Sequence, residues 1–146
     1  TIGALSLISK NITGPIFVMN ADLLTNMSLQ AMIAFHINGG FSSTIASANY
    51  ESNIPCGVLN FNQAGCLHSI DEKPTINYMV AAGLYILNNE VYNLLKYNEK
   101  CDMPDLLNLA VKNNMKNSIF PLHEKWKDIG VPEEYYEAKN SKTTFK

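Results

Sequence analysis

The sequence contains no arginine, so every one of its 11 basic side chains is a lysine. A guanidinium fork, which binds a phosphate through two parallel hydrogen bonds, is therefore excluded. Any phosphate that this chain binds must contact lysine ammonium groups or the backbone N–H groups that begin a helix. The formal net charge of −2 also argues against a nucleic-acid partner, which would need a broad basic surface.

Cysteines and long apolar runs are scarce as well. The three cysteines, Cys56, Cys66 and Cys101, are widely spaced and form no C-x-x-C pair, so neither a zinc site nor a disulfide framework is expected. The most apolar run, 78–87, is far too short to span a membrane as a helix, and no signal peptide is recognisable. We therefore expect a soluble, cytoplasmic protein without a membrane partner.

Apolar residues make up 47% of the chain and charged residues 16%, which is the composition of a folded globular domain. A chain of 146 residues can bury a sizeable core. We predict one domain over residues 1–139 and a C-terminal tail over residues 140–146.

Strand and helix patterns alternate along that domain. Short apolar runs between turn residues predict strands at 15–19, 43–50, 57–61, 67–71, 78–87 and 118–122. Apolar spacing and capping residues predict helices at 28–37, at 89–95, from Asp102 to about 113–114, and from Pro132 onward. This alternation predicts an α/β layered fold with a mixed sheet, because residues 62–65 have the composition of a hairpin turn. No opening strand or glycine-rich turn precedes the pattern, so the chain is expected to begin within a domain.

The expected core includes the whole strand at 78–87 and one face of the helix that follows Asp102. That face is expected to bury Leu106, Leu109 and Ala110. The histidines have no ligand spacing, so we expect core or surface positions for them and not a metal site: His36, His68 and His123.

Two aspartates stand where metal ligands are often found. Asp22 follows the predicted strand 15–19, and ligands of open α/β sheets lie beyond the carboxyl ends of strands. A carboxylate there can hold Mg²⁺, but it can also form hydrogen bonds within a turn, and the residues alone favour the turn. Asp128, just before the final helix, is equally consistent with a metal ligand and with a helix cap.

A lysine and a glutamate end the hairpin strand. In Glu72-Lys73-Pro74, the lysine offers charge to a phosphate and the glutamate can accept hydrogen bonds from sugar hydroxyls. A solvated ion pair is the alternative. Further along, Gly83 lies within a predicted strand, where a glycine permits close approach of a ligand or, more commonly, of another strand.

The order of six short motifs resembles the sugar-phosphate nucleotidylyltransferases, nearest to the mannose-1-phosphate guanylyltransferase type. The motifs are Asn20-x-Asp22, Cys56-Gly57, Glu72-Lys73-Pro74, Ala82-Gly83-Leu84-Tyr85, Asp102-Met103-Pro104-Asp105 and Trp126-x-Asp128-Ile129-Gly130. The resemblance runs from Thr1 to about Ala138. It implies a Rossmann-like layered nucleotidyltransferase fold with a mixed sheet, of which this chain is the C-terminal part, without the N-terminal strands.

The resemblance implies roles for the matched residues. Asp22 and Asp128 match the family's two metal-binding aspartates, and Lys73 matches the lysine that faces the phosphate of the sugar. Five further residues complete the implied substrate contacts. Glu72, Gly57 and Gly83 match residues that contact the sugar, while Thr1 and Gly3 lie in the segment that borders the nucleotide.

The implied reaction is attack by a sugar 1-phosphate oxygen on the α-phosphorus of a nucleoside triphosphate, GTP in the nearest type, with release of pyrophosphate. Mg²⁺ is the implied cofactor, because a cation between the two phosphates offsets their repulsion. A homo-oligomer is left open.

Two features that the family usually has are missing from this chain, so other functions stay open. Ala81 stands where the family usually has an asparagine that binds the sugar, and the glycine-rich loop for the triphosphate is absent. We therefore expect this chain alone to be inactive, and a non-catalytic sugar-nucleotide-binding or regulatory homologue is the second hypothesis. A glycosyltransferase is the third, although its D-x-D pair is represented only by Asn20-Ala21-Asp22.

Overall fold

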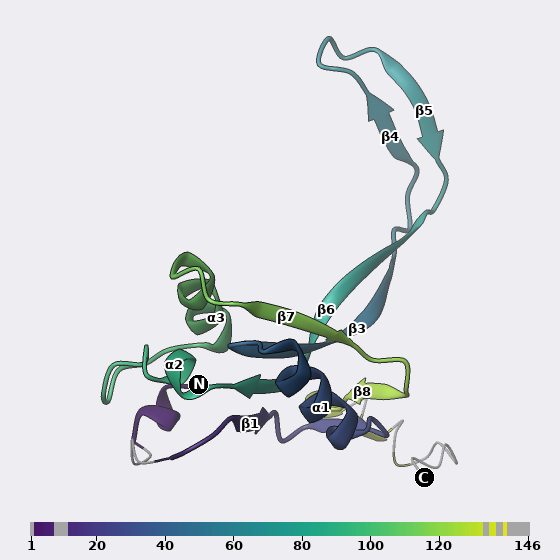
Figure 1. Cartoon of the computed structure of the whole chain (residues 1–146). Coiled ribbons are helices and arrows are strands. Elements are labelled where there is room, and N and C mark those ends of the chain that lie inside the picture. The colour runs from purple at the N-terminus through teal and green to yellow at the C-terminus, as the bar shows by residue number, and fades with distance from the viewer. Residues whose placement is uncertain (1, 8–11, 133–134, 137–138, 140–146) are drawn as a thin grey trace. The chain divides into compact units, whose positions relative to one another are not determined.

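The computed structural model describes residues 2–7, 12–132, 135–136 and 139 (Figure 1). Four strands lie side by side in one sheet, in the order β1 (Ile16–Met19), β6 (Thr75–Leu87), β3 (Ser43–Asn53) and β7 (Asn117–Pro121). β1 runs antiparallel to β6, whereas β7 runs parallel to β3. The sheet is therefore mixed and the protein is mixed α/β, as the sequence predicted.

Helix α1 (Leu29–Gly39) begins and ends where its capping residues predict. The Ser28 hydroxyl accepts a hydrogen bond from the N–H of Ala31 at 3.2 Å. Gly40 follows the helix in the left-handed conformation, and its N–H donates to the carbonyls of His36 and Ile37. A serine N-cap and a glycine C-cap thus set the length of the helix.

The other helical segments are short. Within residues 2–7 and 12–130 they are the 3-10 helix η1 (Ile2–Leu7), α2 (Asn89–Tyr92) and α3 (Met103–Lys112). Pro132 is also helical, where the final helix was predicted to begin, and residues 133–134 and the predicted tail 140–146 lie outside the described residues. α3 follows Asp102, carries Pro104 in its first turn and ends at Lys112, with Asn113 as its C-cap, close to the predicted end at 113–114. α2 ends earlier than the predicted 89–95.

The two faces of the sheet are covered by different helices. Adjacent residues of a strand point to opposite faces, so Thr44 and Ile45 of β3 mark the two sides. Thr44 bonds to the buried His36 of α1 at 2.8 Å. Ile45 packs against the main core cluster, which contains residues of η1, β6, α2, the turn after α2, and α3: Ile2, Tyr85, Leu87, Val91, Tyr92, Leu95, Met103, Leu106 and Ala110. The fold is therefore layered, with α1 on one face and α2 and α3 on the other.

Residues 48–80 form a second compact unit, separate from the unit that holds the remaining described residues. Within it, β4 (Val58–Phe61) and β5 (Leu67–Asp71) make the predicted hairpin. Asn62 shapes the turn, because its Oδ1 accepts hydrogen bonds from the N–H groups of Ala64 and Cys66, each at 3.0 Å. All residues of β4 and β5 except the half-buried Val58 are exposed, including the four apolar side chains of Leu59, Phe61, Leu67 and Ile70.

Two burial predictions are wrong. Strand β6 is buried only from Ala82 onward, whereas Tyr78 and Met79 are exposed because this end of the strand belongs to the second unit. On α3, Leu106 and Ala110 are buried as expected, but Leu109 is 40% exposed because it lies off the buried stripe of the helix.

A two-stranded antiparallel sheet, or ribbon, was not predicted from the sequence. β2 (Leu23–Thr25) pairs antiparallel with β8 (Trp126–Asp128), with Leu23 opposite Asp128. Strands of three residues are too short to show the alternation by which strands are recognised in sequence. The pairing joins segments that are far apart along the chain.

Gly83 has a conformation that side chains disfavour, with φ +76. A methyl group at this position would lie 2.8 Å from Leu23 Cδ1 and 2.9 Å from Asn20 Nδ2. The glycine thus permits both a positive φ and the close approach of the segment that joins β1 to β2. It lies inside β6 without interrupting the strand.

We expect Leu106→Ala to lower the free energy of unfolding by roughly 2–5 kcal/mol, because a fully buried leucine leaves a cavity. Leu109→Ala on the same helix is the matched control, with an expected loss below about 1 kcal/mol. Urea denaturation measures both variants. Equal losses would contradict the assignment of the buried face of α3.

We expect Gly83→Ala to destabilise the protein more than Gly40→Ala, by roughly 1–3 kcal/mol of additional steric cost. Gly40 is the control because it also has a positive φ, +57, but has nothing within 4 Å of the added methyl group. The Gly40 variant therefore reports the conformational cost alone, roughly 1–2 kcal/mol. Thermal unfolding measures the loss of stability in each variant. Equal losses in the two variants would contradict the steric explanation for Gly83.

Candidate active site

Asp22 lies in the turn between β1 and β2. Two residues earlier, the N–H of Asn20 donates to the Gly83 carbonyl of β6 at 2.9 Å. The end of β1 is thereby held against the central part of the large sheet. The turn that follows carries the exposed Asp22 side chain away from the strand.

Asp128 is the last residue of β8 and is brought beside Asp22 by the ribbon. Leu23, next to Asp22, lies opposite Asp128 in the register. The N–H of Ile129 donates to the Asp22 carbonyl at 2.8 Å. Backbone pairing therefore joins two acidic residues that are distant in sequence.

The two carboxylates face the same point, beside Gly130. A methyl group on Gly130 would lie 3.0 Å from Asp22 Oδ2 and 3.1 Å from Asp128 Oδ1. The N–H of Gly130 also donates to Asp128 Oδ1 at 2.9 Å. Two negative charges held this close favour a cation between them.

The interpretation of Asp128 as a helix cap is wrong. Residues 129 and 130 are not helical, so the bond from Gly130 to the Asp128 carboxylate closes a turn. Asp22 likewise lies between two strands and not between a strand and a helix.

The carboxylate pair fits Mg²⁺ and does not fit a metal that needs a full protein cage. Within the described residues, no cluster of three or more His, Cys, Asp or Glu side chains could hold a metal ion. Mg²⁺ commonly binds one or two carboxylates and completes its octahedron with waters and substrate phosphates. Two exposed aspartates with open surroundings provide such a partial ligand set.

Glu72, Lys73 and Gly57 belong to the unit of residues 48–80, whereas Asp22, Asp128 and Gly83 belong to the other unit. A methyl group on Gly57 would lie 3.2 Å from Glu72 Oε2, so the glutamate lies against the bare glycine backbone. The exposed Lys73 has φ +46, which turns the chain between the hairpin and β6.

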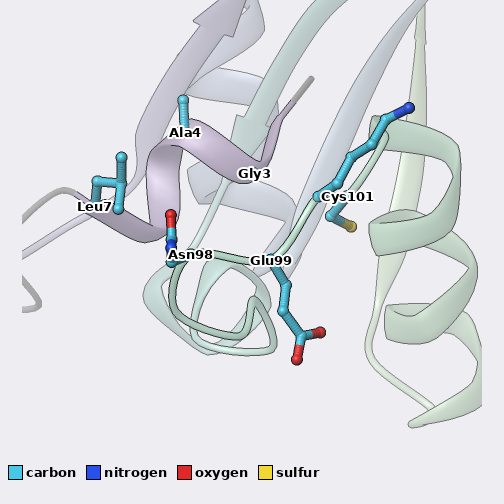
Figure 2. A pocket seen from close by; sticks show the side chains of 7 residues that line it. Gly3, Ala4, Leu7, Asn98, Glu99 and Cys101 are labelled. Atoms are coloured by element: carbon cyan, nitrogen blue, oxygen red, sulfur yellow. The ribbon is translucent and has the colours of Figure 1, made fainter.

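The amino-terminal segment lines a hollow of about 240 Å³. Gly3, Ala4 and Leu7 form one side and residues 98–101 the other, as Figure 2 shows. The N–H of Gly3 donates to the Cys101 carbonyl, and a methyl group on Gly3 would lie 2.5 Å from the Glu99 carbonyl oxygen. Close backbone packing therefore accounts for this glycine. Thr1 lies outside the described residues.

Cys101 is not suited to act as a nucleophile in this hollow. Burial raises the pKa of the Cys101 thiol, and the negative charge of Asp105 raises it further. A raised pKa keeps the thiol protonated at neutral pH, and only the thiolate is strongly nucleophilic.

A second hollow, of about 160 Å³, lies at the end of β1 and was not predicted. Its walls come from η1, β1, β6 and α3: Ile2, Val18, Met19, Asn20, Tyr85 and Met103. No role was predicted for Trp126 from the sequence, although the Trp-x-Asp spacing places it two residues before Asp128. The Trp126 indole N–H donates to the Ala82 carbonyl at 2.9 Å.

No helix within the described part of the chain is long and apolar enough to cross a membrane.

Comparison with curated proteins finds relatives that are longer than this chain. The catalytic subunit beta of mannose-1-phosphate guanylyltransferase from Drosophila melanogaster is 28% identical over 127 residues, which cover 83% of this chain and 33% of that protein. A glucose-1-phosphate adenylyltransferase from Halalkalibacterium halodurans is 25% identical over 134 residues, which cover 84% of this chain and 35% of that protein. The chain thus spans about a third of the length of these relatives.

Comparison with solved structures supports the fold. The crystal structure of HddC from Yersinia pseudotuberculosis has a TM-score of 0.62 and 23% identity, covering 94% of this chain and 60% of that chain. The structure of HddC complexed with GMP-PN has a TM-score of 0.60 and 22% identity, with the same coverage.

A family model described as nucleotidyl transferase matches residues 1–144, which is nearly the whole chain. The resemblance carried by the order of six motifs is therefore confirmed, and the chain belongs to the nucleotidyl transferase family.

Proposed function

We propose that this chain carries the metal-binding and sugar-phosphate-binding part of a sugar-1-phosphate nucleotidylyltransferase. The observation that carries the proposal is the meeting of the Asp22 and Asp128 carboxylates beside Gly130. Neither side chain is buried, so neither is needed for packing, and a β-ribbon nevertheless holds them together. Family membership makes nucleotidyl transfer the chemistry that such a pair serves.

In this reaction the protein has to align two anions and offset their repulsion. Asp22 and Asp128 would hold Mg²⁺, which supplies positive charge and a template for the phosphate oxygens. The sugar 1-phosphate is already ionised at neutral pH, so its oxygen can attack the α-phosphorus without a general base.

Lys73 and Glu72 are the proposed contacts of the sugar phosphate. Lys73 is exposed, and its ammonium group can donate to phosphate oxygens in a chain that has no arginine. The Glu72 carboxylate, placed over the bare backbone of Gly57, can accept hydrogen bonds from sugar hydroxyls. Gly57 then leaves room for a sugar ring, whereas Gly83 and Gly3 are accounted for by the close packing of neighbouring segments.

GTP and mannose 1-phosphate are the proposed substrates. Mannose-1-phosphate guanylyltransferases recur among the similar curated proteins, and the similar HddC was solved with GMP-PN. Pyrophosphate and GDP-mannose would be the products.

A non-catalytic sugar-nucleotide-binding homologue is the second candidate. Ala81, exposed on β6, replaces the asparagine that the family usually provides for the sugar. Such a protein would bind GDP-mannose with the same affinity whether or not Mg²⁺ is present. The catalytic proposal requires binding that Mg²⁺ strengthens, and isothermal titration with and without the ion separates the two.

We expect the chain to bind Mn²⁺, a probe for Mg²⁺, and we expect Asp22→Asn or Asp128→Asn to weaken this binding by at least about tenfold. Even residues that only support metal ligands contribute roughly 10–100-fold to metal affinity, so loss of a ligand itself has at least this effect. Electron paramagnetic resonance of free Mn²⁺ measures the affinity. Asp105→Asn, an exposed aspartate on α3, is the control and should bind as the unmodified chain does. Equal affinities in all four proteins would refute the metal site.

We expect Lys73→Gln to weaken binding of mannose 1-phosphate by about tenfold or more, because a hydrogen bond to a charged group contributes roughly 1.5–3 kcal/mol. Lys112→Gln, an exposed lysine on α3, removes the same charge elsewhere and should leave binding unchanged. Calorimetric titration compares the two variants. A parallel loss in both would indicate a general charge effect and not a phosphate contact.

A further inference from the structure

The segments that carry the two aspartates are both tied to adjacent carbonyls of β6. The Gly83 carbonyl accepts the N–H of Asn20, two residues before Asp22. The Ala82 carbonyl accepts the indole N–H of Trp126, two residues before Asp128. The positions of both aspartates therefore depend on one short stretch of β6, residues 82 and 83.

Gly83 determines how the Ala82 carbonyl is oriented. The φ angle of residue 83 sets the orientation of the preceding peptide, which carries that carbonyl. An extended strand has φ near −120 to −140°, so φ +76 turns this peptide far from its orientation in a regular ladder. Ala82 itself is fully buried, and a buried carbonyl requires a hydrogen-bond donor.

β8 needs such an anchor. It has three residues and pairs with β2, which also has three, in a two-stranded sheet. A ribbon of this size is marginal by itself in water. Trp126 is the single tryptophan of the chain, and its half-buried indole can contribute apolar contact together with one directed donor.

We propose that Trp126 is a positioning residue, whose bond to the Ala82 carbonyl holds β8 so that the Asp128 carboxylate meets that of Asp22. The inference rests on the proposed function in one respect, because the purpose of the meeting is cation binding. Trp126 itself touches no reacting group.

Trp126→Phe tests this role, because it keeps an aromatic ring and removes the N–H donor. Tyr92→Phe is the matched control: the Tyr92 hydroxyl also donates to a backbone carbonyl, that of Ile12 at 3.4 Å, in the core cluster away from the carboxylates. Both variants lose one bond from an aromatic side chain to the backbone. A purely structural role of Trp126 would make the two variants behave alike at the site.

The first readout does not involve metal. Hydrogen exchange of the Ile129 amide, which bonds to the Asp22 carbonyl at 2.8 Å, reports whether the two acidic segments remain joined. We expect Trp126→Phe to speed this exchange by roughly tenfold and Tyr92→Phe to leave it unchanged, in conditions where both proteins are folded. Unchanged exchange at Ile129 in Trp126→Phe overturns the proposal.

The second readout is Mn²⁺ affinity, which we expect Trp126→Phe to weaken by roughly 10–100-fold and Tyr92→Phe to preserve. Normal Mn²⁺ affinity in Trp126→Phe also overturns the proposal. If the unmodified chain binds no Mn²⁺ while Ile129 exchange still depends on Trp126, the proposed metal function fails and the positioning role stands.

Discussion

The structure around the candidate site depends on two neighbouring peptide carbonyls in the middle of β6. One receives the end of β1 and the other receives the indole of Trp126. Both are possible because Gly83 adopts φ +76 and has no side chain to obstruct Asn20 and Leu23. The buried half of β6 therefore does more than fill the core: it sets the positions from which the two acidic segments depart.

The electrostatic character of the site follows from this arrangement and from composition. Holding two carboxylates against one point creates a local excess of negative charge, which a divalent ion relieves. The chain has no arginine, so charge for phosphate must come from a metal or from lysine. Mg²⁺ commonly takes one or two carboxylates and completes its coordination with waters and phosphate oxygens, so the pair supports the proposal of a magnesium site.

Much of the local structure could be read from the sequence, since it depends on nearby residues. Ser28 and Gly40 bound α1, Asn62 shapes the hairpin turn, and Pro104 marks the start of α3. The prediction failed where local pattern and tertiary environment disagree. Tyr78 and Met79 are as apolar as the rest of their strand, yet they are exposed, because burial depends on which unit a residue joins. Leu109 fits the helical spacing but faces solvent.

The sequence by itself determined the family and the mixed α/β class, and its motif order singled out Asp22 and Asp128 as a pair, because motif order and capping chemistry are properties of the linear chain. Only the tertiary structure decided that the carboxylates of Asp22 and Asp128 meet beside Gly130. It also decided that a ribbon of two three-residue strands joins them and that Trp126 bonds this ribbon to β6. The physical reason is the long separation in sequence: such contacts form when distant segments share one hydrogen-bonding surface, and no local propensity encodes them.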